Sequence, residues 1–195
     1  MDILISGVGG QGTVLASKVL ADSRVIEGGR ARTGETIGMS QRGGSVISHV
    51  RTGESYSAFI PVGGADLLLS FELIEGARNI SYLKEGAHAV INTALINPVS
   101  AILGKESCDK EEIMEYISAN SNVFFIDASK LAREAGAIRV VNTILIGFAY
   151  GLGLLDLSGE SIEKSMSKNI RAEYLDLNLK AFRSGIKSAE GVHLN

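Results

Sequence analysis

The feature that most constrains this chain is a glycine-rich segment near its amino terminus. A short apolar run at residues 2–6 leads into GVGGQG at residues 7–12, and residues 13–27 then place apolar side chains at helical spacing. A strand, a G-x-G-x-x-G turn and a helix in this order form the context in which the motif binds phosphate groups. Its candidate cofactor-binding residues are Gly7, Gly9, Gly10, Gln11 and Gly12.

Two interpretations of this turn stay open. An NAD-binding enzyme would also place an acidic residue about 20 positions further on, at the end of the second strand, to bind the ribose. Glu35 is the only candidate, and it lies in a glycine-rich stretch instead of clearly at a strand end. Alternatively, the glycines only make a tight junction between a strand and a helix.

The rest of the chain alternates strands and helices, which indicates an α/β fold. Helical spacing occupies residues 73–83 and 109–119, and residues 45–51 and 56–61 alternate apolar with polar side chains around TGES, which predicts a β-hairpin. Residues 34–44 are polar and glycine-rich, which is typical of a loop. Further short apolar runs predict strands at residues 30–33, 66–72, 88–93 and 122–128.

The carboxyl-terminal third is expected to be helical, over residues 140–155, from Ser158 or Gly159 onward, and over residues 172–184. Residues 140–155 are apolar on nearly every side, so they are buried either in the chain's own core or partly under a subunit interface. The prediction is one domain, residues 1–195, with a Rossmann-like three-layer α/β fold and a mostly parallel sheet that includes a β-hairpin.

Composition excludes several classes of function. The net charge is −3 and basic residues are spread along the chain, so we expect no nucleic-acid partner. The amino terminus has no basic region before its apolar run, and no apolar stretch reaches the roughly 20 residues of a membrane span, so we expect a soluble cytoplasmic protein without a membrane partner. The single cysteine, Cys108, cannot supply the four thiolates of an iron–sulfur cluster, and we expect no metal site.

Three segments together resemble a known family. They are GVGGQG at the start, GMSQRGGSVISHVR at residues 38–51 and ADLLLSFELIEGAR at residues 65–78. On these motifs the chain resembles the gamma-type domain of 2-oxoacid:ferredoxin oxidoreductases, and within that family it is most similar to the beta subunits of indolepyruvate oxidoreductases. The likeness continues through residues 151–166 and 177–185, so it covers essentially the whole chain.

The resemblance implies a Rossmann-like subunit that works beside a large alpha subunit, which holds thiamine diphosphate and iron–sulfur clusters. The complex would convert a 2-oxoacid, coenzyme A and oxidised ferredoxin into acyl-CoA, carbon dioxide and reduced ferredoxin. This chain has neither the cysteines for clusters nor a GDG-type thiamine motif, so it would hold no cofactor alone and would be inactive alone. The family's usual histidine before GMxQRGG is Ile37 here, which puts indolepyruvate itself in doubt as the substrate.

The second loop and the strand ends supply the other candidate binding residues. Arg42 can clamp a phosphate or carboxylate through two parallel hydrogen bonds, or it can anchor the loop to a partner subunit. In open α/β sheets ligands lie at the carboxyl ends of the strands, where Glu72, Asn92 and Asp127 follow apolar runs, although the acids equally suit helix capping. The candidates taken forward are Gln41, Arg42, Gly43, Gly44 and Glu72.

Three hypotheses about function therefore remain. The first is the oxidoreductase subunit, the second a free-standing NAD(P)-dependent dehydrogenase, and the third a non-catalytic module that only rigidifies its partner. Under the first, a bulky residue at Gly9 lowers turnover in a complex that still assembles, whereas under the third it harms assembly alone.

Overall fold

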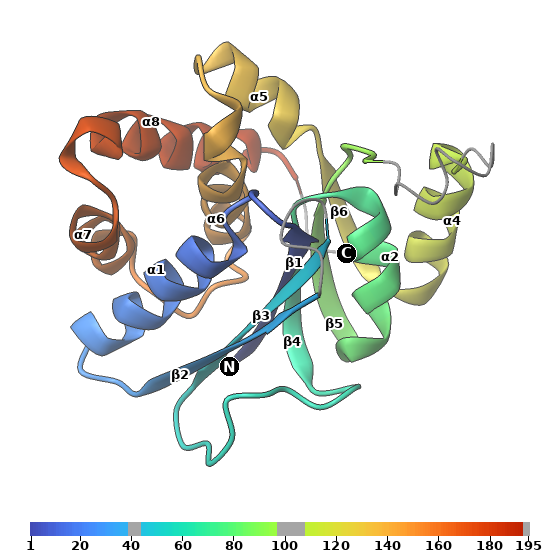
Figure 1. The fold of residues 1–195 in the computed structure, drawn as a ribbon, viewed down its shortest axis with the longest axis horizontal. Helices are drawn as coiled ribbons and strands as arrows, with labels where there is room; N and C mark the ends of the chain where they lie inside the picture. Colours follow the sequence, from blue (N-terminus) through green and yellow to red (C-terminus); the bar gives the residue numbers. More distant parts are fainter. Residues whose placement is uncertain (39–43, 97–107, 193–195) are drawn as a thin grey trace.

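The sheet has six strands in the order β2-β3-β1-β4-β5-β6 in a computed structural model that describes residues 1–38, 44–96 and 108–192. Strand β3 runs antiparallel to its neighbours β1 and β2, whereas β1, β4, β5 and β6 pair in parallel (Figure 1). The strands are β1 Asp2–Val8, β2 Ala31–Ile37, β3 Ser45–Thr52, β4 Ala65–Ser70, β5 Leu83–Asn92 and β6 Asn122–Ile126.

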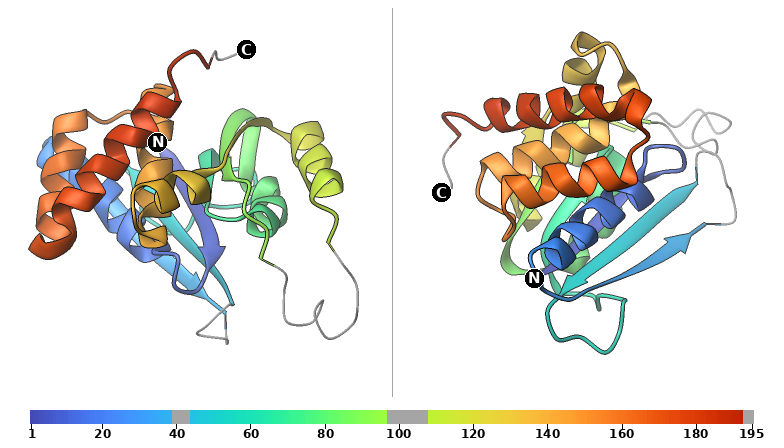
Figure 2. Two further views of the ribbon diagram at one scale, coloured as in Figure 1. Left: turned by 90° about the horizontal axis from the view of Figure 1, so that it is seen from above. Right: turned by 90° about the vertical axis from the view of Figure 1, so that its left-hand side faces the viewer.

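Helices cover both faces of this sheet. Helices α1, α6, α7 and α8 lie over one face, with α5 beside them, and α2 and α4 cover the other (Figures 1 and 2). Two short 3-10 turns, Ile80–Tyr82 and Ile138–Val140, precede β5 and α6. The helices are α1 Thr13–Ile26, α2 Leu73–Asn79, α4 Lys110–Asn120, α5 Ala128–Glu134, α6 Val141–Gly151, α7 Gly159–Asn169 and α8 Ala172–Ser188. The predicted three-layer α/β fold with a mostly parallel sheet and a helical carboxyl-terminal third is confirmed.

Strand β1 connects the two hydrophobic cores because its side chains alternate between the faces of the sheet. Ile3 and Ile5 enter the core beneath α1, α6 and α8, whereas Leu4 enters the core beneath α2 and α4. All three side chains are almost completely buried.

Helix α6 is buried by its own chain. It packs against α8 so closely that a Cβ atom at Gly147 would overlap the carbonyl oxygen of Phe182, and one at Gly185 would overlap the carbonyl oxygen of Ile144. All nine residues from Val141 to Ala149 are buried. The apolar character of the segment predicted at residues 140–155 is therefore explained within the chain, without a subunit interface.

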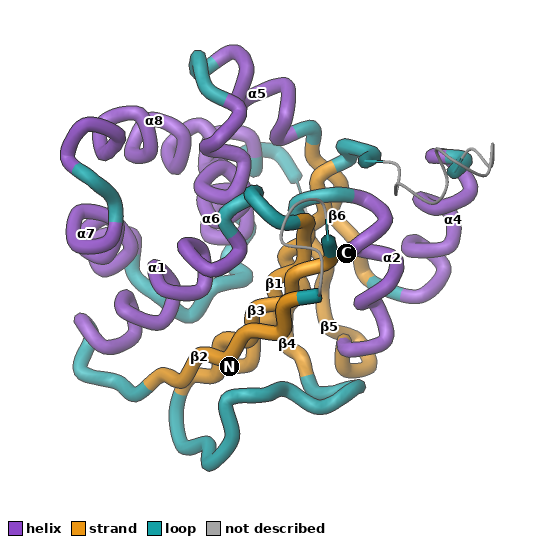
Figure 3. Tube along the Cα trace, viewed as in Figure 1, coloured by secondary structure: helices purple, strands orange, loops and turns teal. Residues whose placement is uncertain are grey.

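The hairpin predicted from residues 45–51 and 56–61 is wrong. Strand β3 pairs with β2, from Thr52 opposite Ala31 to Val46 opposite Ile37, and residues 53–64 run as a loop between β3 and β4 (Figure 3). Strand β2 also includes residues 34–37, which the sequence assigned to a loop. The sheet thus contains a hairpin, formed by β2 and β3. Its first strand, β2, is polar and lies at the edge of the sheet, so its sequence lacks a clear alternation of apolar and polar side chains.

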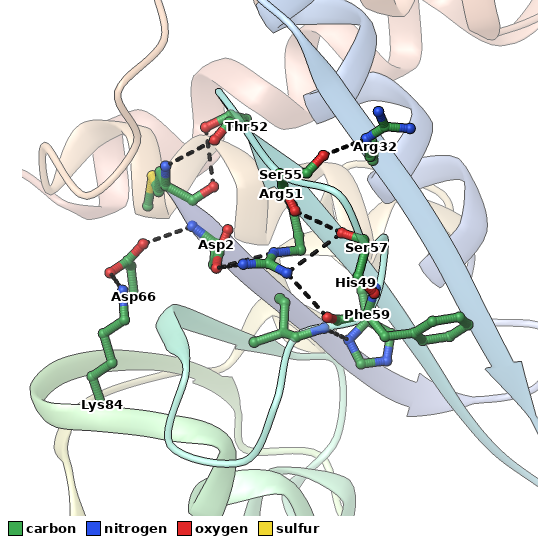
Figure 4. A network of polar contacts seen from close by, with 12 residues as sticks. Asp2, Arg32, His49, Arg51, Thr52, Ser55, Ser57, Phe59, Asp66 and Lys84 are labelled. Atoms are coloured by element: carbon green, nitrogen blue, oxygen red, sulfur yellow. Dashed lines mark hydrogen bonds and ion pairs between the residues drawn. The ribbon is translucent and has the colours of Figure 1, made fainter.

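Side chains of β3 hold the 53–64 loop in place. Arg51 donates from Nη1 to the carbonyl oxygens of Ser57 and Phe59, at 3.4 and 3.2 Å, and pairs with Asp2 at 2.9 Å (Figure 4). His49 accepts a hydrogen bond at Nδ1 from the backbone N–H of Ile60, at 3.2 Å. Phe59 lies edge-on to this histidine, with ring centroids 5.2 Å apart, and Ile60 is buried, so the apolar residues at the end of the segment pack as part of a loop and not of a strand.

His49 should make the stability of the protein depend on pH. Burial, and next the charge of Arg51, hold the pKa of His49 below its usual value of 6.5. At a pH between the lowered pKa and 6.5, His49 therefore binds a proton in the unfolded chain but stays neutral in the folded protein. The free energy of unfolding is greatest above pH 6.5 and falls as the pH drops through the lowered pKa, by at most about 1.4 kcal/mol per pH unit.

The control for this effect is His49→Asn, which keeps an acceptor near the Ile60 N–H but does not titrate. Urea unfolding of both proteins between about pH 7.5 and pH 5.5, the range over which histidines titrate, should give a steeper loss of stability for the parent. Equal pH dependence in the two proteins would contradict the role assigned to His49.

Candidate functional site

The described members of the predicted site, which are residues 7–12, Gly44 and Glu72, lie at the carboxyl edge of the sheet, where β1 and β4 lie side by side. The helix after β1 covers one face of the sheet and the helix after β4 covers the other, so the two connections diverge at this edge. Such a switch point is where open α/β sheets bind ligands. The glycine turn of residues 7–12 forms one side of it, and residues 71–72 form the other.

Gln11 braces the glycine turn from within. Its Oε1 accepts a hydrogen bond from the N–H of Val8 at 2.8 Å, and its Nε2 donates to the carbonyl oxygen of Phe71 at 3.4 Å. Gly7 leaves room for this side chain, because a Cβ atom there would lie 2.7 Å from Gln11 Oε1 and would displace it. Both polar ends of Gln11 are therefore used inside the protein, so its place in the candidate set is that of a brace.

The amides of the turn divide into two groups. Those of Val8, Gly9 and Gln11 donate within the protein, the one of Gly9 to the carbonyl oxygen of Gly44 at 2.9 Å. Those of Gly10, Gly12 and the first turn of α1 have no acceptor among the described residues. Gly10 has a φ of 99°, is exposed and has no atom within 4 Å of a Cβ position. Unpaired amides beside open space at a helix start suit an anion.

The second predicted loop begins and ends beside this turn. Gln41, Arg42 and Gly43 lie outside the described residues, but Gly44 is described and contacts Gly9 through its carbonyl oxygen. The N–H of Gly38 bonds to the carbonyl oxygen of Ser45 at 3.1 Å, which brings the two ends of the loop together. Ile37, at the end of β2, is 59% exposed.

Glu72 is buried and caps α2. Its carboxylate accepts hydrogen bonds from the N–H groups of Glu75, Ile74 at 3.1 Å and Ile96 at 3.5 Å. Burial raises the pKa of Glu72 above its usual value, against the opposing effect of these hydrogen bonds. The capping interpretation of Glu72 is thus the one that its contacts support.

The other polar residues at the strand ends also have structural contacts. Asp127 caps α5 by accepting from the N–H of Lys130 at 2.8 Å. Asn92 is 1% exposed and donates from Nδ2 to the carbonyl oxygen of Phe71 at 2.9 Å and to Ser129 at 3.0 Å. Helix α5 itself was missed from the sequence, although Asp127 was its start signal.

Sequence reasoning also missed a buried carboxylate beside the loop. Glu75 is 1% exposed, pairs with Arg78 at 2.7 Å and accepts a hydrogen bond from Ser45 Oγ at 2.5 Å. It therefore ties α2 to the end of the 38–44 loop. Its position three residues after the Glu72 cap was the available signal, because a glutamate there is typical of a helix start.

Comparison with known proteins identifies the family. The family model described as pyruvate ferredoxin/flavodoxin oxidoreductase matches residues 2–188. The chain belongs to this family. Indolepyruvate oxidoreductase subunit IorB of Pyrococcus horikoshii is 39% identical over 193 residues, which cover 97% of this chain and 96% of the relative. The common gamma subunit of the pyruvate/ketoisovalerate oxidoreductases of Pyrococcus abyssi is 26% identical over 97% of each chain.

Solved structures of the family agree with the fold. The gamma subunit of a keto/oxoacid ferredoxin oxidoreductase from Geobacter sulfurreducens superposes with a TM-score of 0.70 at 25% identity, over 96% of this chain and 97% of that one. A 2-oxoglutarate:ferredoxin oxidoreductase chain from Magnetococcus marinus gives 0.77 at 20% identity, over 99% of this chain but 31% of that one. The same fold is therefore one part of a longer chain in that enzyme.

Family membership and geometry both oppose the NAD-dependent dehydrogenase. Glu35, the residue that would bind the ribose, lies within β2 and accepts a hydrogen bond from Ser17 Oγ at 3.4 Å. The described residues contain no cluster of metal-binding side chains, and none of their helices is long and apolar enough to cross a membrane. The single cysteine does not fit an iron–sulfur cluster.

Replacing Gln11 tests whether it braces the turn. Gln11→Glu keeps the acceptor for Val8 but sets a carboxylate oxygen against the Phe71 carbonyl oxygen, so the free energy of unfolding should fall by about 1–2 kcal/mol. The control is Asn120→Asp, which removes a similar hydrogen bond from a side-chain amide to a carbonyl oxygen, that of Tyr116, at an exposed site. Because water can replace the lost donor there, the free energy of unfolding should fall by less than about 0.5 kcal/mol. Equal losses in chemical denaturation would refute the brace.

Proposed function

We propose that this chain is the small, cofactor-free subunit of a 2-oxoacid:ferredoxin oxidoreductase and is inactive without a large subunit. In the assembled enzyme a 2-oxoacid, coenzyme A and two oxidised ferredoxins give acyl-CoA, carbon dioxide, two reduced ferredoxins and a proton. The partner supplies thiamine diphosphate and the iron–sulfur clusters, since this chain has one cysteine and no thiamine motif. The setting is the cytoplasm.

The observation that carries this proposal is the open face of the glycine turn in a member of this family. The unpaired amides of Gly10, Gly12 and the first turn of α1 offer hydrogen bonds and a positive helix end to an anionic group. That group is a phosphate of coenzyme A or of the thiamine diphosphate held by the partner. From the sequence, Gln41, Arg42, Gly43 and Gly44 are further candidates to bind the same group.

The substrate class follows from the relatives. Four relatives with identities of 33–39% carry the name indolepyruvate oxidoreductase subunit IorB, which favours an aryl 2-oxoacid. Ile37 stands beside the loop where the family pattern has histidine, and its exposed side chain makes that position apolar. The relatives therefore favour an aryl 2-oxoacid, while Ile37 argues that this acid is not indolepyruvate itself.

Purification from the native cell tests the assembly. Tagged chain isolated without oxygen should bring down a large thiamine-dependent subunit in a brown complex whose absorbance shows iron–sulfur clusters, and that complex should reduce ferredoxin with an aryl 2-oxoacid and coenzyme A. A colourless protein without companions would overturn the proposal.

A matched pair of glycine variants then tests the turn. Gly10 and Gly53 both have a positive φ, 99° and 89°, and neither has an atom within 4 Å of a Cβ position. Alanine at either position introduces similar backbone strain, but only Gly10 lies at the carboxyl edge of the sheet. Gly10→Ala should lower turnover of the assembled complex by about tenfold or more, because the methyl group displaces the anion.

Gly53→Ala should leave turnover close to that of the parent, since it lies at the opposite edge of the sheet. If Gly10→Ala reduces the yield of complex but the complex that forms has normal turnover, the chain is an assembly module and the ligand role of the turn is wrong.

A further inference from the structure

A groove lies beside the glycine turn, on the face of the sheet that α1, α6, α7 and α8 cover. It has a volume of about 620 Å³ and is formed by the α5–α6 connection, the α7–α8 junction, α8 and the first turn of α1. This volume is within the usual range for sites that bind small molecules. Its principal lining residues are Leu15, Ile138, Arg139, Arg171, Tyr174 and Leu177.

The walls of the groove are apolar and partly exposed. Ile138 and Tyr174 are 53% and 44% exposed, and both line the groove. Leu15, Ile170 and Leu177 are half-buried behind them. A ligand with an apolar body would remove these side chains from water, which favours binding.

Two arginines give the groove its charge. Arg139 and Arg171 both line it, and neither makes an ion pair or side-chain hydrogen bond with any described residue. The lining includes no acidic residue. Five other arginines of the chain, by contrast, pair with carboxylates: Arg24, Arg30, Arg51, Arg78 and Arg183. Two guanidinium groups without partners make the groove suitable for a carboxylate.

Buried polar side chains connect the groove with the glycine turn. Asn178, which lines the groove and is 7% exposed, accepts a hydrogen bond from Thr143 at 2.7 Å. The neighbouring Asn142 donates from Nδ2 to the carbonyl oxygen of Gly12 at 3.4 Å. The groove and the turn are thus fixed relative to each other, yet each presents its own charged groups.

We propose that this groove binds an organic anion with an apolar body, of the class of aryl or branched-chain carboxylates. The carboxylate lies between Arg139 and Arg171, and the apolar body lies against Tyr174 and the aliphatic wall. The groove shares with the candidate anion site only the first turn of α1, whose Leu15 lines the groove, and it includes neither Gly10 nor Gly12. The site is additional to the proposed function and does not depend on it.

Titration of the full-length chain with phenylacetate tests this site. Binding measured by calorimetry should weaken by about tenfold or more for the neutral phenylacetamide, and likewise for acetate, which lacks the apolar body. Arg139→Gln and Arg171→Gln should each weaken phenylacetate binding to a similar extent. Arg133→Gln, a change to an exposed arginine of α5 outside the groove, should not.

Three results of the titration would overturn the proposal. The first is no phenylacetate binding at about 10 mM, since such a ligand would bind more weakly than a millimolar one, whose binding free energy is roughly 4 kcal/mol. The others are equal binding of the amide and unchanged binding in both groove variants. If the assembled complex excludes phenylacetate and Arg139→Gln mainly lowers assembly, the groove holds a partner segment and the ligand proposal is also wrong. Gly10→Ala should bind phenylacetate normally, so failure of this site and of the proposed function are separable.

Discussion

The burial of strand β1 from Ile3 to Gly7 is the constraint on which the rest of the structure depends. Both edges of β1 are paired, to β3 and β4, and its side chains enter both hydrophobic cores. The chain can therefore leave β1 only at its ends. At the carboxyl end it turns at once into α1, while β4 lies alongside β1 in the sheet and α2 covers the other face. The glycines follow from this crowding before any ligand is considered.

Within the glycine turn, structural and binding roles belong to different residues. Gly7 makes room for the Gln11 side chain, and Gly12 makes room for Asn142, whose Nδ2 would lie 2.6 Å from a Cβ atom. Gly10 instead faces open space and carries an unpaired amide among the described residues. The tight-junction interpretation is thus confirmed at Gly7 and Gly12, whereas the anion site at Gly10 stays a prediction.

The sequence predicted what local patterns determine and missed what distant contacts determine. Helix α1 and strands β1, β4 and β6 have strong periodicity or apolar runs, so their positions were predicted closely, whereas β5 begins at Leu83, five residues before the strand predicted at residues 88–93. Strand β2 is a polar edge strand that its pairing with β3 defines, so the hairpin was assigned to the wrong segment. Arg139 and Arg171 come together only through the packing of α6 with α8, and nothing in their local sequence predicts the groove.

The two edges of the sheet differ in how completely their charges are compensated. At the amino edge, Asp2, Arg51, Asp66 and Lys84 form a closed network, and the 53–64 loop covers His49. At the carboxyl edge, the amides of Gly10 and Gly12 and the two groove arginines have no acceptors among the described residues. The chain as a whole carries a net charge of −3, so its attraction for anions is local to this edge. Since unpaired donors are costly when desolvated, we expect the donors at this edge to bind water or an anion.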